Sequence, residues 1–255
     1  PAWMPQKAGD SVYDAGTASE CWVLLDSGSA ATRTGGSDSL VLPDFTREAT
    51  RKWWSGLIDN LAKGGVAGFV LPRRNQLELP PAATLRGDPA LGGPGHAEQY
   101  GMVLPTLSAR ATVQGAGGEK ADRRPFVSAD APALTLQRSA AVVLRSPGRD
   151  WDSLRALIPA ALNTTLSGHP LVGVEIPDFG GSDPALGRRW TGLAATFPLS
   201  VGRFELANDS PMLTPEFKTT LTAAMQRRYR LIPYYYSLCF DAFFRCEPIM
   251  RPLFL

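Results

Sequence analysis

The sequence predicts an α/β protein built on a parallel sheet. Short, nearly continuous apolar runs are typical of strands buried on both faces. Segments of helical length lie between them, and Gly- and Pro-rich turns separate the two kinds of segment. Strand and helix therefore alternate along the chain, as they do in parallel α/β sheets. The five predicted strands are Val66–Leu71, Arg124–Val127, Ala140–Leu144, Leu171–Ile176 and Phe197–Ser200.

The first 43 residues differ in composition from the rest. They are rich in Gly, Ser, Ala and Thr, with scattered aromatic residues. This composition predicts irregular loop, with a short hairpin around Cys21–Leu25. We therefore expect residues 1–43 to form a loop-rich segment that precedes or is inserted in a domain formed by residues 44–255.

Helices are expected between the strands. Thr46 is predicted to cap the first, which ends in Lys63 and stops at Gly64. A second helix is predicted over 105–115, ahead of the second strand.

Three more helices follow the later strands. Asp150 is predicted to cap a helix that runs to Leu166, and Ser182 opens the next. Thr214 caps the last and longest helix, which Pro233 is expected to bend.

Composition excludes several classes of function. The chain has 26 Lys and Arg against 24 Asp and Glu, so its net charge of +2 does not favour nucleic acid as a partner. It has no apolar run long enough for a membrane span. Cys21, Cys239 and Cys246 are expected to be packed free thiols. Neither His96 nor His169 has partners at metal-ligand spacing, so no metal and no cofactor is expected.

Several blocks of the sequence resemble glycoside hydrolase family 31, the α-glucosidase family. Their order and spacing agree with the catalytic barrel of that family across most of the chain. The blocks are Pro43–Thr46 with Trp53 and Trp54, Ala109–Thr112, Arg124–Val127, Asp150–Gly173 and Arg227–Leu253.

The resemblance implies a (β/α)8 TIM barrel, of which this chain represents the C-terminal five strands, four to eight. Five strands cannot close an eight-stranded barrel. We therefore expect other segments of a longer chain, or a larger protein assembly, to supply the remaining strands.

The resemblance also implies the position of a retaining active site, which needs two carboxylates flanking the glycosidic bond. The family nucleophile is the Asp of a Trp-x-Asp-Met-Asn-Glu motif that ends strand four. Pro72 stands at that position, and Arg74 replaces the Asn of the motif. A proline has no side-chain oxygen to form a glycosyl ester.

The other family positions at the strand ends are changed as well. Ser146 stands where the acid/base Asp ends strand six, and Asp130 where the family has an Arg after strand five. Glu175 replaces an Asp at the end of strand seven. Val201 and Arg203 lie where strand eight delivers a sugar-binding Arg-Asn-His trio. A vestigial pocket formed by these residues is expected, with Arg145 paired to Asp130 or Glu175.

These replacements predict a catalytically inactive, α-glucosidase-like domain that acts as a structural or interaction module. Two alternatives stay open. One is a carbohydrate-binding module without hydrolysis, with Trp3, Trp22 and Tyr100 as the nearest aromatic candidates for stacking on a sugar. The other is an active O-glycosyl hydrolase rebuilt around Asp130 and Glu175. The family resemblance is also the only pointer to a compartment, the secretory pathway or the cell exterior.

Overall fold

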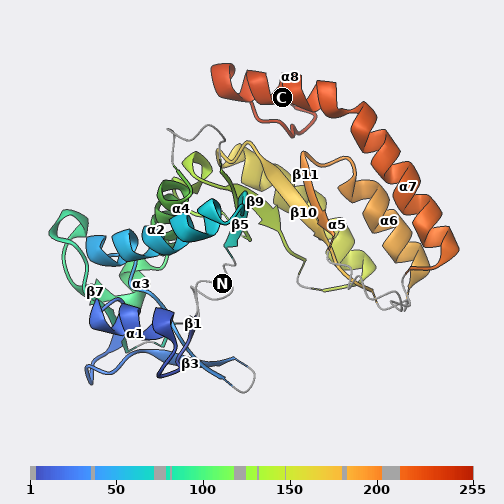
Figure 1. The fold of residues 1–255 in the computed structure, drawn as a ribbon. Coiled ribbons are helices and arrows are strands. Elements are labelled where there is room, and N and C mark those ends of the chain that lie inside the picture. The colour runs from blue at the N-terminus through green and yellow to red at the C-terminus, as the bar shows by residue number, and fades with distance from the viewer. Residues whose placement is uncertain are drawn as a thin grey trace. The chain divides into compact units, whose positions relative to one another are not determined.

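The protein divides into two compact units, residues 1–140 and 141–255, in a computed structural model. The structure describes residues 4–35, 38–71, 79–80, 82–117, 125–130, 132–146, 148–179, 183–202 and 213–254. Among these residues no helix is long and apolar enough to cross a bilayer. Figure 1 shows the succession of helices and strands along the chain.

The first unit combines four helices with short strands. The helices are α1 (Ser11–Ala18), α2 (Glu48–Lys63), α3 (Ala97–Tyr100) and α4 (Leu104–Gly115), with 3-10 turns at Pro89–Leu91 and Leu136–Arg138. The strands are β1 (Met4–Pro5), β2 (Leu24–Leu25), β3 (Thr32–Gly35), β4 (Asp38–Val41), β5 (Gly68–Leu71), β6 (Ala83–Leu85), β7 (Gly95–His96) and β8 (Phe126–Ala129).

Strand pairing in the first unit is of two kinds. β5 and β8 are parallel, with Gly68 opposite Phe126 and Leu71 opposite Ala129. Two antiparallel sheets, β1-β4-β3 and β2-β6-β7, come from the remaining strands. The parallel strands thus belong to the α/β part, and the antiparallel strands lie either before α2 or between β5 and α3.

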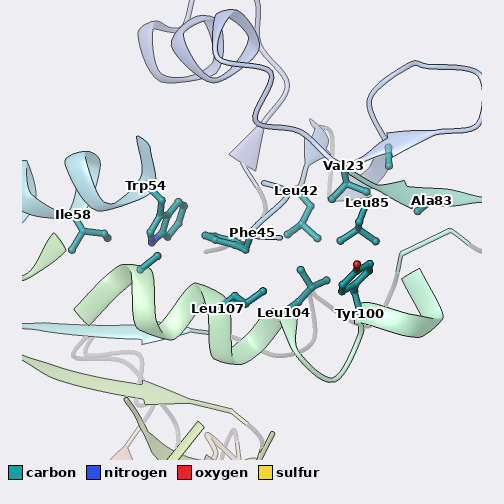
Figure 2. Packing of buried hydrophobic residues seen from close by; sticks show 12 residues of the cluster. Val23, Leu42, Phe45, Trp54, Ile58, Ala83, Leu85, Tyr100, Leu104 and Leu107 are labelled. Carbon is teal, nitrogen blue, oxygen red and sulfur yellow. The ribbon is translucent and has the colours of Figure 1, made fainter. Parts of the chain in front are cut away.

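The core of the first unit lies where α2 and α4 meet the N-terminal strands. Figure 2 shows Phe45 between Trp54 of α2 and Leu42, with Leu107 of α4 beside Phe45 and Leu104 farther along the same helix. Gly115 permits this close approach, because a Cβ there would lie 2.4 Å from the Ser55 carbonyl oxygen.

The second unit is a parallel sheet with helices. Its strands are β9 (Ala141–Leu144), β10 (Val172–Ile176) and β11 (Leu199–Gly202), and β10 pairs in parallel with both neighbours. Its helices are α5 (Trp151–Leu166), α6 (Pro184–Ala194), α7 (Pro215–Arg230) and α8 (Ile232–Arg245). Val172, Val174 and Ile176 pack against buried residues of α5 and α6 in one apolar core.

All five predicted strands are therefore present, and each pairs in parallel with another of the five. One expectation about them is wrong. The run at Val66–Leu71 is not buried on both faces, because Val66 and Val70 are exposed, Val70 by 53%. Phe69 and Leu71 point to the other face, where Phe69 packs against the core of the first unit.

Residues 1–43 contain more regular structure than their composition predicts. Asp10 caps α1 by accepting hydrogen bonds from the backbone N–H groups of Val12 and Tyr13. β3 and β4 form an antiparallel pair where loop was expected. The helix is stabilised from outside itself, because Trp22 stacks on Tyr13 and its indole N–H donates to Thr17.

Two predicted helix caps are replaced by their neighbours. Arg47, not Thr46, is the N-cap of α2, because the Thr46 side chain is used in a buried network instead. Asp183, not Ser182, caps α6 by accepting from the Leu186 N–H. The caps at Asp150 and Thr214 are confirmed.

The C-terminal helical region also differs from the single bent helix expected. It consists of two helices that meet at Leu231, with Pro233 in the first turn of α8, where a missing N–H costs no hydrogen bond. Cys239 and Cys246 are exposed, so the expectation that they are packed holds only for Cys21.

Candidate functional site

Asp130 and Ser146 lie just after β8 and β9, and Glu175 and Val201 lie next to the last residues of β10 and β11. These are the carboxyl ends of parallel strands, where barrel enzymes place their catalytic groups. Pro72, Arg74 and Arg203 lie outside the described residues, so their roles stay predictions. Asp130 belongs to the first unit, whereas Ser146, Glu175 and Val201 belong to the second. A carboxylate pair between Asp130 and Glu175 therefore stays a prediction too.

Asp130 immediately follows β8. Its backbone N–H donates to the Leu71 carbonyl oxygen at 3.2 Å, which extends the β5–β8 ladder by one residue. The residue is half-buried, and one of its carboxylate oxygens, Oδ2, is shielded from solvent. Asp130 is thus positioned by the end of the strand, as its place in the sequence predicts.

The register of the strands in the second unit places Arg145, Glu175 and Val201 side by side across the sheet. Glu175 of β10 is paired with Val201 of β11. On the other side, Leu144 of β9 is paired with Val174, so Arg145 follows level with Glu175. Since side chains alternate between faces along a strand, Arg145, Glu175 and Val201 project on the same face of the sheet.

Arg145 and Glu175 form an ion pair. The Arg145 Nε lies 3.0 Å from Glu175 Oε2, and the two side chains are 29% and 14% exposed. Glu175 is one of the two partners expected for Arg145. To act as a nucleophile or a proton donor, the Glu175 carboxylate would have to give up this ion pair with the guanidinium.

Neighbouring groups fix the backbone of Glu175. Its carbonyl oxygen accepts a hydrogen bond from the indole N–H of Trp190 at 3.0 Å. Trp190 lies on α6, is fully buried and packs edge-on against Phe179. The strand end that carries Glu175 is thus joined to the helix layer by a tryptophan that is fully buried.

Ser146 lies two residues after β9. Its hydroxyl oxygen is shielded from solvent and has no hydrogen-bond partner within the part of the chain that is described. A serine without an activating base is not a useful general acid near neutral pH.

Gly173 shows how tightly the sheet is packed beneath this site. A Cβ at this position would lie 2.7 Å from the Leu199 carbonyl oxygen and 2.8 Å from the Leu199 Cβ. β11 therefore approaches β10 in a way that leaves no space for a side chain at Gly173.

We expect Gly173→Ala to destabilise the protein by about 1–3 kcal/mol, because the two strands must move apart. Gly192→Ala is the matched control. Gly192 lies inside α6 with no atom within 4 Å of the added Cβ, so alanine is expected to raise stability by up to about 1 kcal/mol. Urea unfolding measures both, and equal effects would contradict the predicted strand contact.

His169 precedes β10 and is buried. Its Nδ1 is shielded from solvent without a hydrogen-bond partner among the described residues, and burial lowers the pKa of the imidazole. His96 is exposed on β7. No group of three or more His, Cys, Asp or Glu side chains in the described ranges is arranged to hold a metal ion.

His169 is expected to make the protein less stable in acid. With its pKa lowered in the folded state, the imidazole binds more protons when unfolded, so stability is lost as the pH falls below the unfolded pKa near 6.5. The loss cannot exceed about 1.4 kcal/mol per pH unit. His169→Gln should flatten the dependence of unfolding free energy on pH between 5 and 7. Parallel curves for the parent protein and the variant would contradict this assignment.

The aromatic residues considered for sugar stacking are not available. Trp22 is 4% exposed and Tyr100 8%, and both pack inside the first unit. Trp3 lies outside the described residues. The expectation that Trp22 or Tyr100 could offer a stacking surface is wrong, because both rings are covered by protein.

A buried polar network at the start of α2 was missed by the sequence analysis. Asp44 is fully buried and accepts hydrogen bonds from the Thr46 N–H at 3.1 Å, the Thr46 hydroxyl and the Arg86 N–H at 2.8 Å. The Thr46 hydroxyl oxygen accepts from the Gly87 N–H. Burial raises the pKa of the Asp44 carboxyl, which these hydrogen bonds partly oppose. The network joins the start of α2 to the loop after β6.

The sequence blocks behind the family resemblance are joined to one another by scaffold contacts. The Trp54 indole N–H donates to the Thr112 hydroxyl at 2.9 Å, linking α2 to α4. The Arg228 guanidinium donates to the carbonyl oxygens of Phe197 and Pro198, just before β11. Trp54 and Arg228 therefore hold helices and strands in place, and neither is one of the candidate site residues at the strand ends.

Comparison with known proteins identifies the scaffold. A family model described as the glycosyl hydrolases family 31 TIM-barrel domain matches residues 1–238. The "Probable glucan 1,3-alpha-glucosidase" of rice is 30% identical over 225 residues, which cover 84% of this chain and 24% of the rice protein. Human "Neutral alpha-glucosidase AB" is 29% identical, with the same two coverages.

Solved structures agree over the whole chain. The family 31 α-glucosidase of Bacteroides thetaiotaomicron superposes with a TM-score of 0.81 at 28% identity, over 99% of this chain and 42% of that protein. A Flavobacterium johnsoniae dextranase has a TM-score of 0.79 at 17% identity, which shows the fold alone. The expected fold, part of a (β/α)8 barrel, is confirmed. The chain spans about a quarter of the length of the human and rice relatives.

Proposed function

Since the chain belongs to glycoside hydrolase family 31, we propose that it is a catalytically inactive, α-glucosidase-like barrel module that serves as a structural or interaction part of a larger protein. The observation that carries the proposal is the Arg145–Glu175 ion pair. Glu175 is the single acidic residue in the three strands of the second unit, and a guanidinium occupies its Oε2.

Retaining hydrolysis needs a nucleophilic carboxylate and a protonated carboxyl about 5–5.5 Å apart. By the family motifs these positions are Pro72 and Ser146. A proline offers no nucleophile, and the Ser146 hydroxyl has no base beside it in the described chain.

Sugar binding without hydrolysis is the weaker candidate. The buried state of Trp22 and Tyr100 removes two aromatic surfaces that a sugar ring could contact. Arg145 and Glu175 form an ion pair, so a sugar hydroxyl that binds either group competes with an interaction already formed. We therefore favour a role in assembly over a role in carbohydrate binding.

The test is a hydrolysis assay of the purified chain with an aryl α-glucoside, maltose and a glucan between pH 4 and 8, with the Bacteroides enzyme as positive control. We expect no turnover above buffer and no heat of binding with the same sugars in calorimetry. Turnover that survives Pro72→Ala and Ser146→Ala but disappears in Glu175→Gln or Asp130→Asn would overturn the proposal in favour of a rebuilt site.

A further inference from the structure

One face of α5 carries an acceptor sequence for an N-linked glycan. Asn163-Thr164-Thr165 matches the pattern Asn-x-Ser/Thr, in which the middle residue is not proline. The chain has one other match, Asn208-Asp209-Ser210, which lies outside the described residues. The structure therefore bears on the first match, where it decides whether a large, hydrated group can be carried.

The side chain of Asn163 is exposed in the folded protein. It lies in the last turn of α5, whereas Ala161 and Thr164 nearby are buried. α5 thus packs with one face and presents Asn163 on the other. The Asn163 side chain makes no hydrogen bond or ion pair with any described residue. A group attached to its amide nitrogen therefore displaces no contact that the fold uses.

The surface around Asn163 is uncharged and partly apolar. On a helix the neighbours of a residue lie three and four positions away. Those of Asn163 are all exposed: Pro159, Ala160, Leu166 and Ser167, with Leu166 47% exposed. The charged residues of α5 lie in its first two turns. An oligosaccharide at Asn163 therefore has room to extend from the helix, and its bulk would shield the exposed leucine.

The hydroxyl group of the acceptor sequence is bound in the folded protein. Thr165 is 3% exposed, and its Oγ1 donates to the Leu162 carbonyl oxygen at 2.9 Å and to the Met250 carbonyl oxygen at 3.0 Å. Transfer needs the hydroxyl two residues after the asparagine, so folded α5 is not a substrate. Met250 lies 85 residues after Thr165, so their contact forms only when almost the whole chain has been made. The acceptor sequence therefore stays accessible through most of synthesis.

We propose that Asn163 carries an N-linked glycan, attached while the chain is translocated into the secretory pathway and before Thr165 contacts Met250. The co-reactant is a lipid-diphosphate-linked oligosaccharide. The amide nitrogen of Asn163 forms a bond to the anomeric carbon of the sugar, and the bond from that carbon to the diphosphate oxygen breaks. The amide loses one proton, and the lipid diphosphate leaves with the electron pair. Glycosylation of Asn163 does not depend on whether the barrel is catalytically active.

In the first test, the 255-residue chain is translated behind a cleavable signal peptide with endoplasmic-reticulum microsomes present. Only translocated chains, which resist added protease, are scored. In an Asn208→Gln background we expect a gel shift of one glycan that endoglycosidase H removes, and Asn163→Gln should abolish this shift. Translocated chains without a glycan, or a shift that survives Asn163→Gln, would overturn the proposal.

Two substitutions at Thr165 are the matched controls. Thr165→Ser keeps the hydroxyl and should keep the glycan, whereas Thr165→Val keeps the shape of the side chain and should lose the glycan. Both changes act on a chain that is not yet folded, so the stability of α5 does not enter the comparison. A glycan that survives Thr165→Val would show that modification does not follow this acceptor sequence.

A second test measures when transfer occurs. The folded, unglycosylated chain and a synthetic peptide of residues 160–168 are each offered to the purified transferase with the lipid-linked oligosaccharide. We expect the chain to react at least about tenfold more slowly than the peptide, because α5 must first open locally. Equal rates would contradict transfer before folding.

A third test measures whether the folded protein tolerates the glycan. The glycosylated chain and the Asn163→Gln chain should unfold at the same urea concentration, because Asn163 is exposed and its side chain is not used by the fold. A lower midpoint for the glycosylated chain would mean that Asn163 is covered in the folded protein, which would overturn the site.

Discussion

A chimera in which this chain replaces the matched segment of the Bacteroides α-glucosidase is expected to hydrolyse an aryl α-glucoside at least about 10⁴-fold more slowly than the parent enzyme. General acid/base assistance alone contributes about 10²- to 10⁴-fold. If Pro72 and Ser146 stand at the two catalytic positions, as we propose, the chimera lacks both that group and the nucleophile. The chimera supplies the rest of the barrel, so an incomplete sheet cannot account for the loss. Steady-state kinetics measure the effect, and thermal unfolding checks that the chimera is folded.

Restoring aspartate in the chimera by Pro72→Asp and Ser146→Asp is not expected to recover the activity. Arg74, Asp130 and Val201 would still differ from the family residues that contact the sugar, and the Arg145–Glu175 pair would stay in place. Effects of groups that act together are not additive, so two carboxylates without their surroundings recover little. Recovery to within about tenfold of the parent by these two changes would contradict the proposed loss of sugar contacts.

The Asp44→Ala variant is expected to lose about 2–4 kcal/mol of unfolding free energy. The substitution leaves the N–H groups of Thr46 and Arg86 and the Thr46 hydroxyl without their acceptor, and each buried unsatisfied group costs about 1–3 kcal/mol. Removing a desolvated carboxylate offsets part of that cost. Urea unfolding at pH 7 measures the difference.

Asp152→Ala is the control for this prediction, because Asp152 forms an exposed pair with Arg155 that should contribute less than about 0.5 kcal/mol. The pH dependence gives a second check. Burial raises the pKa of Asp44, so the proton-linked part of its contribution to stability is present below the unfolded pKa and is lost as the pH rises through the folded pKa. The cost of Asp44→Ala should therefore be larger in acid than at pH 7. A loss for Asp44→Ala no larger than that for Asp152→Ala would show that the network contributes little.

Local sequence signals succeeded where the structure depends on neighbouring residues. The caps at Asp150 and Thr214 are made by a side chain and a backbone N–H three residues away, so both can be recognised from the sequence. The five strands were recognisable because their apolar runs are bounded by turns. An acidic partner for Arg145 at a neighbouring strand end was predicted, since consecutive parallel strands place equivalent strand ends side by side, but the choice of Glu175 over Asp130 came from the structure.

Signals failed where distant residues decide the local structure. α1 is capped locally by Asp10, a signal that the composition of residues 1–43 does not reveal, and Trp22 packs on the helix from the segment that follows it. Thr46 looked like a helix cap, but its hydroxyl binds Asp44 and accepts from Gly87, which is 41 residues away. The sequence alone could not decide between Thr46 and Arg47 as the N-cap of α2, because the partners of the Thr46 side chain are known only once the chain is folded.

The sequence by itself determined the order of the five parallel strands, the family and the residue types at positions 72 and 146, because these are matters of residue type and spacing. The tertiary structure alone decided which charged side chains are paired and which apolar side chains are exposed. Arg145 forms an ion pair with the Glu175 carboxylate. The rings of Trp22 and Tyr100 are covered by protein, whereas Tyr236, Phe240 and Phe243 of α8 are exposed. Burial and pairing depend on which distant segments meet, and one segment's sequence cannot specify its neighbours in space.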